Sequence, residues 1–311
     1  MDPERAAVMT VAETERTIAR RVLETCMAND LPAEVAIARL ALYLTDTEAA
    51  ELADIALDMR SDALHRRGWL EQVAMLLSRK TVVFDDLRTT AASVRHDRSD
   101  DETGELIVGR LASGFDQAAA ISPAASVQLS SLGDEEMLSA TTAEIASWLE
   151  QQGFTGAGKT ILDIGCGIGR FERALHARVK YIVGIDISSR MLAIARRRCA
   201  GLANVEFRQT SGLDLGEFAV AGFDGVLAVD CFPYLVLAGI AERHFSEMAR
   251  VLRPTGLAAI LNYSYRMSPA VDSSDIRHLA RTCGMDVIID GEMPFRHWDG
   301  TAFLVRRRDG T

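Results

Sequence analysis

A glycine-rich segment in the second half of the chain has the residue types that bring a backbone close to a ligand. Residues 161–169 read ILDIGCGIG, so a short apolar stretch runs directly into three alternating glycines. Glycine permits a sharp turn and leaves no side chain between the backbone and a bound molecule. A helix that starts immediately afterwards would offer its free N–H groups to a polar group of that molecule. The pattern therefore predicts a ligand-binding turn.

Two acids extend this pattern. Asp163 lies two positions before the first glycine, where dinucleotide-binding folds usually have an apolar residue. A second apolar stretch ends at Asp186, whose carboxylate can accept hydrogen bonds from both hydroxyls of a ribose. The glycines have GxGxG spacing rather than GxGxxG, which argues against a nicotinamide dinucleotide. A turn without a ligand is the structural alternative, and the coincidence of the glycines with both acids disfavours it.

With these residues, the segment from about Leu138 to Arg306 resembles the class I S-adenosylmethionine-dependent methyltransferases. The run HFSEMARVLRP at residues 244–254 is similar to the helix and turn before the fifth strand of that family. The resemblance implies an enzyme that uses S-adenosyl-L-methionine as its cofactor. The family's first motif is an acid followed by GxGxG, and it is matched by Asp163, Gly165, Gly167 and Gly169, with Cys166 between the glycines.

The resemblance also implies roles around the cofactor. Asp186 falls on the acid that binds the ribose, and Ile187 on the residue that packs against the adenine. The third strand of the family usually ends in an acid that holds the adenine amino group. Here Ser211 stands in that position and Gly212 follows it, which departs from the family pattern. We include Asp230, after the fourth strand, in the predicted cofactor-binding set.

The candidate catalytic residues lie in segments that should reach the carboxyl ends of the strands, where open α/β sheets bind their ligands. Methyl transfer needs an in-line approach to the sulfonium, and a base only where the acceptor is protonated and weakly acidic. We select one residue after the fourth strand, one after the fifth strand and one between the last two strands. They are Asp230, Tyr263 and His297.

Each of these candidates has a structural alternative. Asp230 could cap its own loop. Tyr263 and Tyr265 are separated by one residue, and we expect one of the two to face the site and the other to face the core or a partner. His297 can accept a proton near pH 7 as a neutral imidazole, but a surface position is equally open to it. The other histidines lie in helical or linker segments, and we assign them no chemistry.

An alternation of strands and helices positions these residues, and it is typical of a parallel sheet with helices on both faces. The connection 291–300 between the last two strands is too short for a crossover helix, which predicts an antiparallel final pair. The predicted fold class is α/β, with a Rossmann-like, mostly parallel seven-stranded sheet whose last strand is antiparallel. The strand candidates are Thr160–Ile164, Tyr181–Ile185, Val205–Gln209, Gly225–Val229, Leu257–Asn262, Met285–Asp290 and Thr301–Arg306.

The first part of the chain is predicted to be all-helical. Residues 13–93 have apolar side chains at helical spacing, and Thr45 and Glu48 have the spacing of a capping box. The charged stretch that follows is nearly free of apolar residues, which predicts a solvated linker that does not order itself. The predicted domains are a helical N-terminal domain (1–95), a charged linker (96–105) and a methyltransferase domain (106–311), itself a helical cover (106–152) and a Rossmann-like core (153–311).

The segment from about Phe115 to Leu132 is expected to form part of the acceptor site. An open sheet alone leaves the sulfonium exposed, and this segment is the nearest material that could cover it. Ser122-Pro123 and Gly133 provide the breaks that allow it to fold over. The helices before the linker are expected to serve as a lid or as a dimer surface.

Composition restricts the partners. The net charge of -10 and the pI of about 5.2 disfavour a broad phosphate-binding surface, so we expect no nucleic-acid partner. No apolar run approaches the roughly 20 residues of a membrane span, and the N-terminus lacks the layout of a signal peptide. The scattered cysteines indicate neither a disulfide framework nor a metal site. We expect a cytoplasmic protein with no membrane span and no metal. A homodimer is compatible with the sequence.

The predicted function is the transfer of a methyl group to an O or N atom of a small-molecule acceptor. Two alternatives stay open. In the first, the acceptor is a protein, a peptide or a lipid head group, and the N-terminal helices are a docking module. In the second, the chain is a non-catalytic S-adenosylmethionine-binding protein that pairs with a partner. The residues do not identify the acceptor or the methylated atom.

Overall fold

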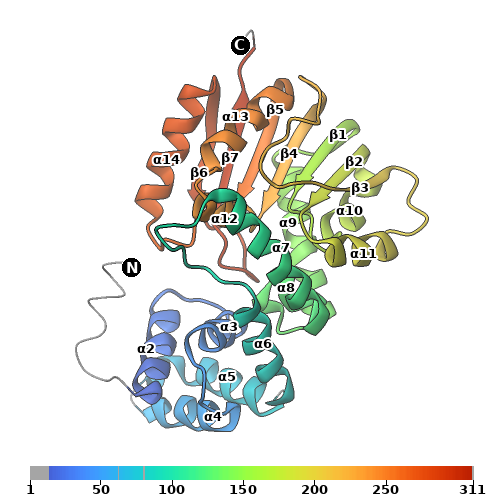
Figure 1. Cartoon of the computed structure of the whole chain (residues 1–311). Helices are drawn as coiled ribbons and strands as arrows, with labels where there is room; N and C mark the ends of the chain where they lie inside the picture. The colour runs from blue at the N-terminus through green and yellow to red at the C-terminus, as the bar shows by residue number, and fades with distance from the viewer. Residues whose placement is uncertain (1–13, 62, 80, 310–311) are drawn as a thin grey trace.

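The computed structural model describes residues 14–61, 63–79 and 81–309, and the statements below concern these residues. It shows a helical bundle formed by the first part of the chain, next to an α/β domain formed by the second part (Figure 1). The bundle comprises α2 (Glu15–Ala28), α3 (Ala33–Tyr43), α4 (Ala49–Asp58), α5 (Arg67–Arg79) and α6 (Thr81–Ser93), with short 3-10 turns at Met59–Ser61 and Leu64–Arg66.

The bundle has an apolar core of its own. Helices of this length are marginal in isolation, so their stability comes from packing. Leu23, Leu40 and Leu52 are fully buried in this core. Ala125 and Leu132, which belong to the segment leading into the α/β domain, are buried in the same cluster. The bundle and the second part of the chain therefore share packing.

The predicted capping box at Thr45 and Glu48 is wrong. Helix α4 begins at Ala49 behind Glu48, and Glu48 makes no side-chain capping hydrogen bond. The carboxylate of Glu15 in α2 instead accepts the backbone N–H groups of residues 45–47, the bond from Thr47 N–H being 2.7 Å long. The distant Glu15 thus accepts the Thr45 N–H that the capping box assigned to Glu48.

The charged linker is exposed, as predicted, but it is ordered. The guanidinium of Arg110 donates to the Glu102 carboxylate (3.0 Å) and to the backbone carbonyls of Arg95 (3.2 Å) and Asp97 (2.9 Å). The expectation considered only the burial of apolar surface. The segment has no apolar core, and charge-assisted hydrogen bonds to Arg110 hold it instead.

The breaks predicted between residues 106 and 152 are confirmed. The Ser122 side chain accepts the N–H of Ala125 (3.3 Å) at the start of the short α8, and Asp134 accepts the N–H of Glu136 (2.8 Å) at the start of α9. This segment consists of α7 (Gly104–Ile121), α8 (Pro123–Val127), a 3-10 turn (Leu129–Ser131) and α9 (Glu135–Gln151).

The sheet has seven strands in the order β3-β2-β1-β4-β5-β7-β6, and β7 is antiparallel to both β5 and β6. This confirms the predicted fold class. The strands are β1 (Gly156–Ile164), β2 (Val179–Asp186), β3 (Val205–Gln209), β4 (Phe223–Val229), β5 (Leu252–Leu261), β6 (Met285–Glu292) and β7 (Ala302–Arg307), and the helices between them are α10 (Arg170–Leu175), α11 (Ser189–Arg198), α12 (Phe232–Ala238), α13 (Ala241–Val251) and α14 (Pro269–Thr282).

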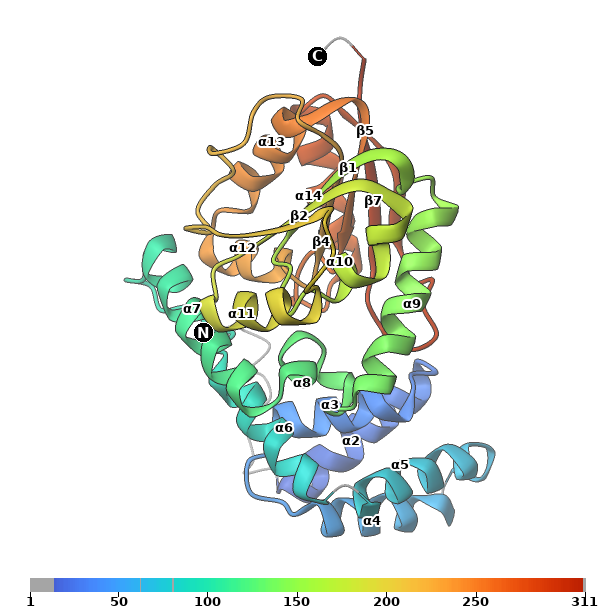
Figure 2. The same ribbon diagram turned by 90° about the vertical axis from the view of Figure 1, so that its right-hand side faces the viewer.

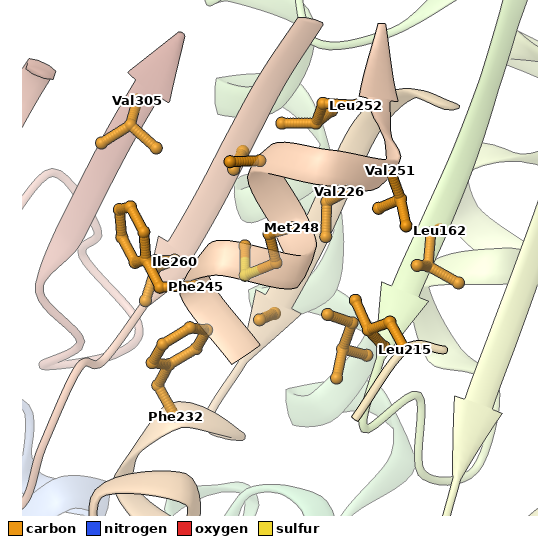
Figure 3. Close-up of a cluster of buried hydrophobic side chains, with 14 of the residues drawn as sticks. Leu162, Leu215, Val226, Phe232, Phe245, Met248, Val251, Leu252, Ile260 and Val305 are labelled. Carbon is orange, nitrogen blue, oxygen red and sulfur yellow. The ribbon is translucent and has the colours of Figure 1, made fainter. Parts of the chain in front are cut away.

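Apolar cores cover both faces of the sheet. Neighbouring residues of a strand point to opposite faces, so Leu162 joins one core and Ile161 the other. On the first face, Phe245 and Met248 of α13 pack against the sheet (Figure 3). Because the strands are buried on both faces, their ends are fixed, and the loops at their carboxyl ends start from a rigid edge. In the part of the chain that the structure describes, no helix combines the length and the apolar character needed to cross a membrane.

Candidate active site

The glycine turn after β1 adopts the backbone conformation that requires glycine. Gly165, Gly167 and Gly169 have φ values of 71°, 54° and 77°, which side chains rarely tolerate. The N–H of Gly165 donates to the carbonyl of Ile185 (2.8 Å) and ties the turn to β2. A Cβ atom on Gly167 would lie 2.7 Å from Cγ1 of Val127. The turn therefore leaves no room for a side chain at Gly167.

Asp186 joins the end of β2 to this turn. Its Oδ2 accepts the N–H of Gly167 (2.8 Å) and its Oδ1 accepts the N–H of Ser188 (2.8 Å). The residue is 8% exposed, and burial raises the pKa of its carboxyl to about 6 although the backbone hydrogen bonds lower it. Each oxygen keeps a second acceptor position. The carboxylate can therefore accept ribose hydroxyls while it holds the turn, which fits the predicted role.

Asp163 is buried beside Glu172, an acid of α10 that the sequence analysis did not single out. Burial raises the pKa of Asp163 to about 7, and burial together with the charge of Asp163 raises the pKa of Glu172 well above its ordinary value. Two adjacent buried carboxyls cannot both ionise at low cost. The pair therefore retains a proton at the end of β1, next to the start of the glycine turn.

The predicted adenine-binding residues lie at the ends of β2 and β3. Ile187 and Gly212 are neighbours, because a Cβ on Gly212 would lie 2.5 Å from Cγ2 of Ile187. Cγ1 of Val108, from α7, would be 3.1 Å from the same atom. Ser211 is exposed, and its hydroxyl accepts the N–H of Leu213 (3.3 Å). Ile187 and Gly212 thus form one apolar corner, which α7 closes.

The residues that directly follow the neighbouring strands β4 and β5 both have a left-handed backbone conformation. Asp230 has φ 53° and Asn262 has φ 64°, a conformation that only a few per cent of non-glycine residues adopt. Asn262 accepts the N–H of Thr301 through Oδ1 (2.9 Å), which directs its Nδ2 to Oδ1 of Asp230 (2.6 Å). Tyr265 donates its hydroxyl to the same oxygen (3.2 Å). Both hydrogen bonds therefore hold the Asp230 carboxylate through Oδ1, which leaves Oδ2 for a ligand.

Asp230 has the electrostatics of a base near neutral pH. Desolvation raises the pKa of its carboxyl to about 6, and the charge of nearby Asp299 adds to the increase. The hydrogen bond from Asn262 and the charge of Arg170 oppose it. The Asp230 carboxylate can thus accept a proton at physiological pH.

Residues 161–256, which include the glycine turn and Asp186, match the family profile described as a methyltransferase domain. The chain carries a class I S-adenosylmethionine-dependent methyltransferase domain. Demethylmenaquinone methyltransferase of Tropheryma whipplei (strain Twist) is 38% identical over 109 residues, which cover 35% of this chain and 44% of that protein. The enzyme of the same name from Clavibacter sepedonicus is 31% identical over 165 residues, 52% of this chain and 62% of that protein.

The chain thus spans about half the length of these curated relatives. Among solved structures, phosphoethanolamine N-methyltransferase 1 of Haemonchus contortus superposes with a TM-score of 0.52 and 16% identity, over 68% of this chain and 51% of that one. This likeness concerns the fold alone. It extends beyond the region of the family match.

Two predicted catalytic residues of the methyltransferase domain lie away from Asp230. Tyr263 is 4% exposed and stacks on Phe232 of the core, with the ring centroids 5.8 Å apart. Of the two alternating tyrosines, Tyr265 contacts Asp230, whereas Tyr263 packs in the core. His297 is exposed, and its backbone N–H donates to Glu144 of α9 (3.1 Å). The loop that carries His297 is tied to α9, and its ring faces solvent.

Helices α7 and α8 lie next to α11 of the α/β domain (Figure 2). Asp116 of α7 accepts the hydroxyl of Ser188 and the N–H of Arg190 (3.0 Å) at the start of α11. Gln128, just after α8, accepts from the buried guanidinium of Arg170 (2.7 Å). The segment from Phe115 to Leu132 therefore packs next to the glycine turn, and its part in an acceptor site stays a prediction.

Four aromatic rings meet above the ends of β4 and β5, and we call them the ring cluster: His96, Phe115, Tyr234 and Tyr265. Tyr234 is central, with centroids 5.0 Å from Phe115, 5.6 Å from His96 and 5.8 Å from Tyr265. The sequence analysis assigned His96 no chemistry and did not select Tyr234. The rings come from four separate segments, so no spacing in the sequence indicates that they meet.

Proposed function

We propose that the protein transfers a methyl group from S-adenosyl-L-methionine to an O or N atom of a small-molecule acceptor. One observation carries the proposal: the Asp186 carboxylate holds the glycine turn, and Asp230 lies at the end of a strand on the same sheet edge. The turn and Asp186 fit a nucleoside-containing cofactor, and Asp230 fits a proton acceptor next to it. The relatives named demethylmenaquinone methyltransferase support a small organic acceptor.

Different residues would bind different parts of the cofactor. Asp186 would bind the ribose, Ile187 and Gly212 would pack on the adenine, and the turn around Gly167 would offer backbone groups to the rest of the cofactor. When bound, the cofactor supplies an activated methyl group on a sulfonium. The protein's own part is to align the acceptor, exclude water and accept a proton. Asp230 accepts that proton through Oδ2, while Asn262 and Tyr265 hold its other oxygen.

The remaining expectations belong to the same proposal. We infer a cytoplasmic enzyme without a nucleic-acid partner, in line with the net charge of -10. We also propose the domain bounds given above for the helical domain, the linker and the methyltransferase domain. The N-terminal helices would act as a lid or as the surface of a homodimer. His297 would act only if its loop turned its ring toward Asp230.

Calorimetry with S-adenosylhomocysteine and with NAD tests the cofactor. We expect binding of S-adenosylhomocysteine and none of NAD, because Asp163 and the GxGxG spacing suit the first. The reverse result would falsify the assignment. A second measurement separates the enzyme from a binding protein: formation of S-adenosylhomocysteine in the presence of an acceptor panel. Tight binding with no turnover on any acceptor would favour the non-catalytic alternative.

A further inference from the structure

The ring cluster remains open to solvent although its rings touch one another. His96 is exposed, Tyr265 is 46% exposed, and Phe115 and Tyr234 are half-buried. Aromatic rings that serve only packing are usually covered on all sides, as Phe232 and Phe245 are in this domain. A group of partly exposed rings at the mouth of a site indicates a surface that a ligand completes.

The angles between the rings suit a flat aromatic ligand. Phe115 and Tyr234 meet at 83°, and Tyr234 and Tyr265 at 85°, so the edge of one ring faces the plane of the next. This edge-to-face arrangement is the favoured geometry of aromatic pairs. A planar aromatic ligand can act as a further ring of the cluster and make the same edge-to-face contact with these side chains. A saturated ring of equal size offers neither a flat face nor a polarised edge.

The charges around the cluster favour a neutral ligand. The Asp230 carboxylate faces the buried guanidinium of Arg170, and each charge favours the ionised form of the other. Asp299, the other acid that acts on Asp230, is paired with Arg39 (2.8 Å). An ammonium group would therefore meet no uncompensated carboxylate. An anionic group would likewise meet no uncompensated cation, because the guanidinium of Arg170 is engaged by Asp230 and Gln128.

We propose that the ring cluster and Asp230 form the acceptor site, that its acceptor class is a neutral planar aromatic compound with a hydroxyl group, and that Tyr234 determines this specificity. The inference rests on the proposed function. The hydroxyl proton passes to Oδ2 of Asp230, the acceptor oxygen bonds to the methyl carbon, and the carbon–sulfur bond breaks. The sulfur keeps the electron pair of that bond, so the sulfonium becomes the neutral thioether of S-adenosylhomocysteine.

Binding to the full-length protein saturated with S-adenosylhomocysteine tests this class. The probes are 2-naphthol, its saturated counterpart decahydro-2-naphthol, and cyclohexylammonium, followed by saturation-transfer NMR. The variants are Tyr234→Leu, which removes the ring, and Tyr234→Phe, which keeps it. Phe218→Leu is the matched control, because Phe218 meets Phe223 edge to face at 5.5 Å in the core away from the cluster.

We expect 2-naphthol to bind at least 10-fold more tightly than the saturated alcohol or the ammonium. Tyr234→Leu should weaken naphthol binding about 3- to 10-fold, the range for one aromatic contact, while Tyr234→Phe and Phe218→Leu leave it unchanged. Equal affinity for the planar and saturated alcohols, preference for the ammonium, or an equal loss in Phe218→Leu would overturn the proposal. If S-adenosylhomocysteine itself does not bind, the proposed function fails first, and the two failures are distinguishable.

Discussion

Single carboxylates determine how the candidate site behaves, and Asp186 is the one with the clearest double role. It holds the glycine turn through the N–H groups of Gly167 and Ser188, and it has acceptor positions left for a ribose. We expect Asp186→Ala to weaken S-adenosylhomocysteine binding by about 2–4 kcal/mol, because charge-assisted hydrogen bonds are lost and their partners stay partly desolvated. Calorimetry on the folded variant measures this loss. An affinity equal to that of the parent protein would show that another residue binds the ribose.

The buried pair Asp163 and Glu172 makes stability depend on pH. Both pKa values are raised in the folded state, so folding takes up protons. The stabilisation is fully present below the ordinary carboxyl pKa values near 4 and is lost as the pH rises through the folded pKa of about 7 for Asp163. We expect the free energy of unfolding in urea to fall between pH 5 and pH 7.5.

Glu172→Gln is the variant that isolates this pair. A neutral amide cannot ionise, so the fall in unfolding free energy over the same pH range should become smaller by more than about 1.4 kcal/mol, the equivalent of one pKa unit. Glu150→Gln is the control, since Glu150 forms an exposed ion pair with Arg178. A pH dependence that is identical in the parent protein and in Glu172→Gln would contradict the assignment.

At the scale of elements, helix α8 occupies space next to the glycine turn where we expect the cofactor to bind. Val127 lies against Gly167, where the cofactor is expected, and Gln128 holds Arg170 nearby. We therefore expect cofactor binding to displace α8, and any contact that keeps α8 in place should then lower the apparent affinity. The breaks at Ser122 and Gly133 delimit the segment that can move.

Val127→Ala should tighten S-adenosylhomocysteine binding about 2- to 5-fold, because the closed arrangement loses part of its packing. The same substitution should lower the free energy of unfolding by about 1 kcal/mol. Val22→Ala, at a partly buried position of α2 in the bundle, serves as a comparison for the general effect of a smaller side chain. Calorimetry and urea unfolding give both quantities. If the affinity falls in step with stability, α8 contributes to the cofactor site and does not oppose binding.

At the scale of the whole molecule, an ion pair connects the bundle to the loop between β6 and β7. Arg39 of α3 bonds Asp299 in the loop between β6 and β7 at 2.8 Å, and the charge of Asp299 raises the pKa of Asp230. Removing Arg39 leaves the charge of Asp299 uncompensated. The pKa of Asp230 should then rise further.

The pH profile of kcat/KM records this effect. Asp230 must be ionised to accept a proton, so activity should fall as the pH drops below its pKa of about 6. We expect Arg39→Gln to move this acid limb to higher pH and Asp299→Asn to move it to lower pH. Arg16→Gln, which breaks an exposed ion pair with Asp58 elsewhere in the bundle, should leave the limb in place. A limb that does not respond to Arg39 or Asp299 would separate the bundle from catalysis.

Local sequence determined the sheet and the cofactor-binding edge. Short apolar runs marked the central strands β1, β2, β4 and β5, because strands buried on both faces are mostly apolar, and the short final connection required an antiparallel pair. The glycine turn was equally local, since three positive φ angles in one turn demand glycine at fixed spacing. Asp186 followed from its place at the end of the next strand.

Only the tertiary structure decided which side chains meet above that edge. A period of two leaves Tyr263 and Tyr265 equivalent until the direction of the strand end is known, and the left-handed turn at Asn262 places Tyr265 beside Asp230. His96, Phe115 and Tyr234 are joined by packing between separate segments, and Glu172 reaches Asp163 by the placement of α10 on the sheet. Spacing along the chain encodes contacts within an element or a turn, whereas contacts between elements depend on how their faces pack.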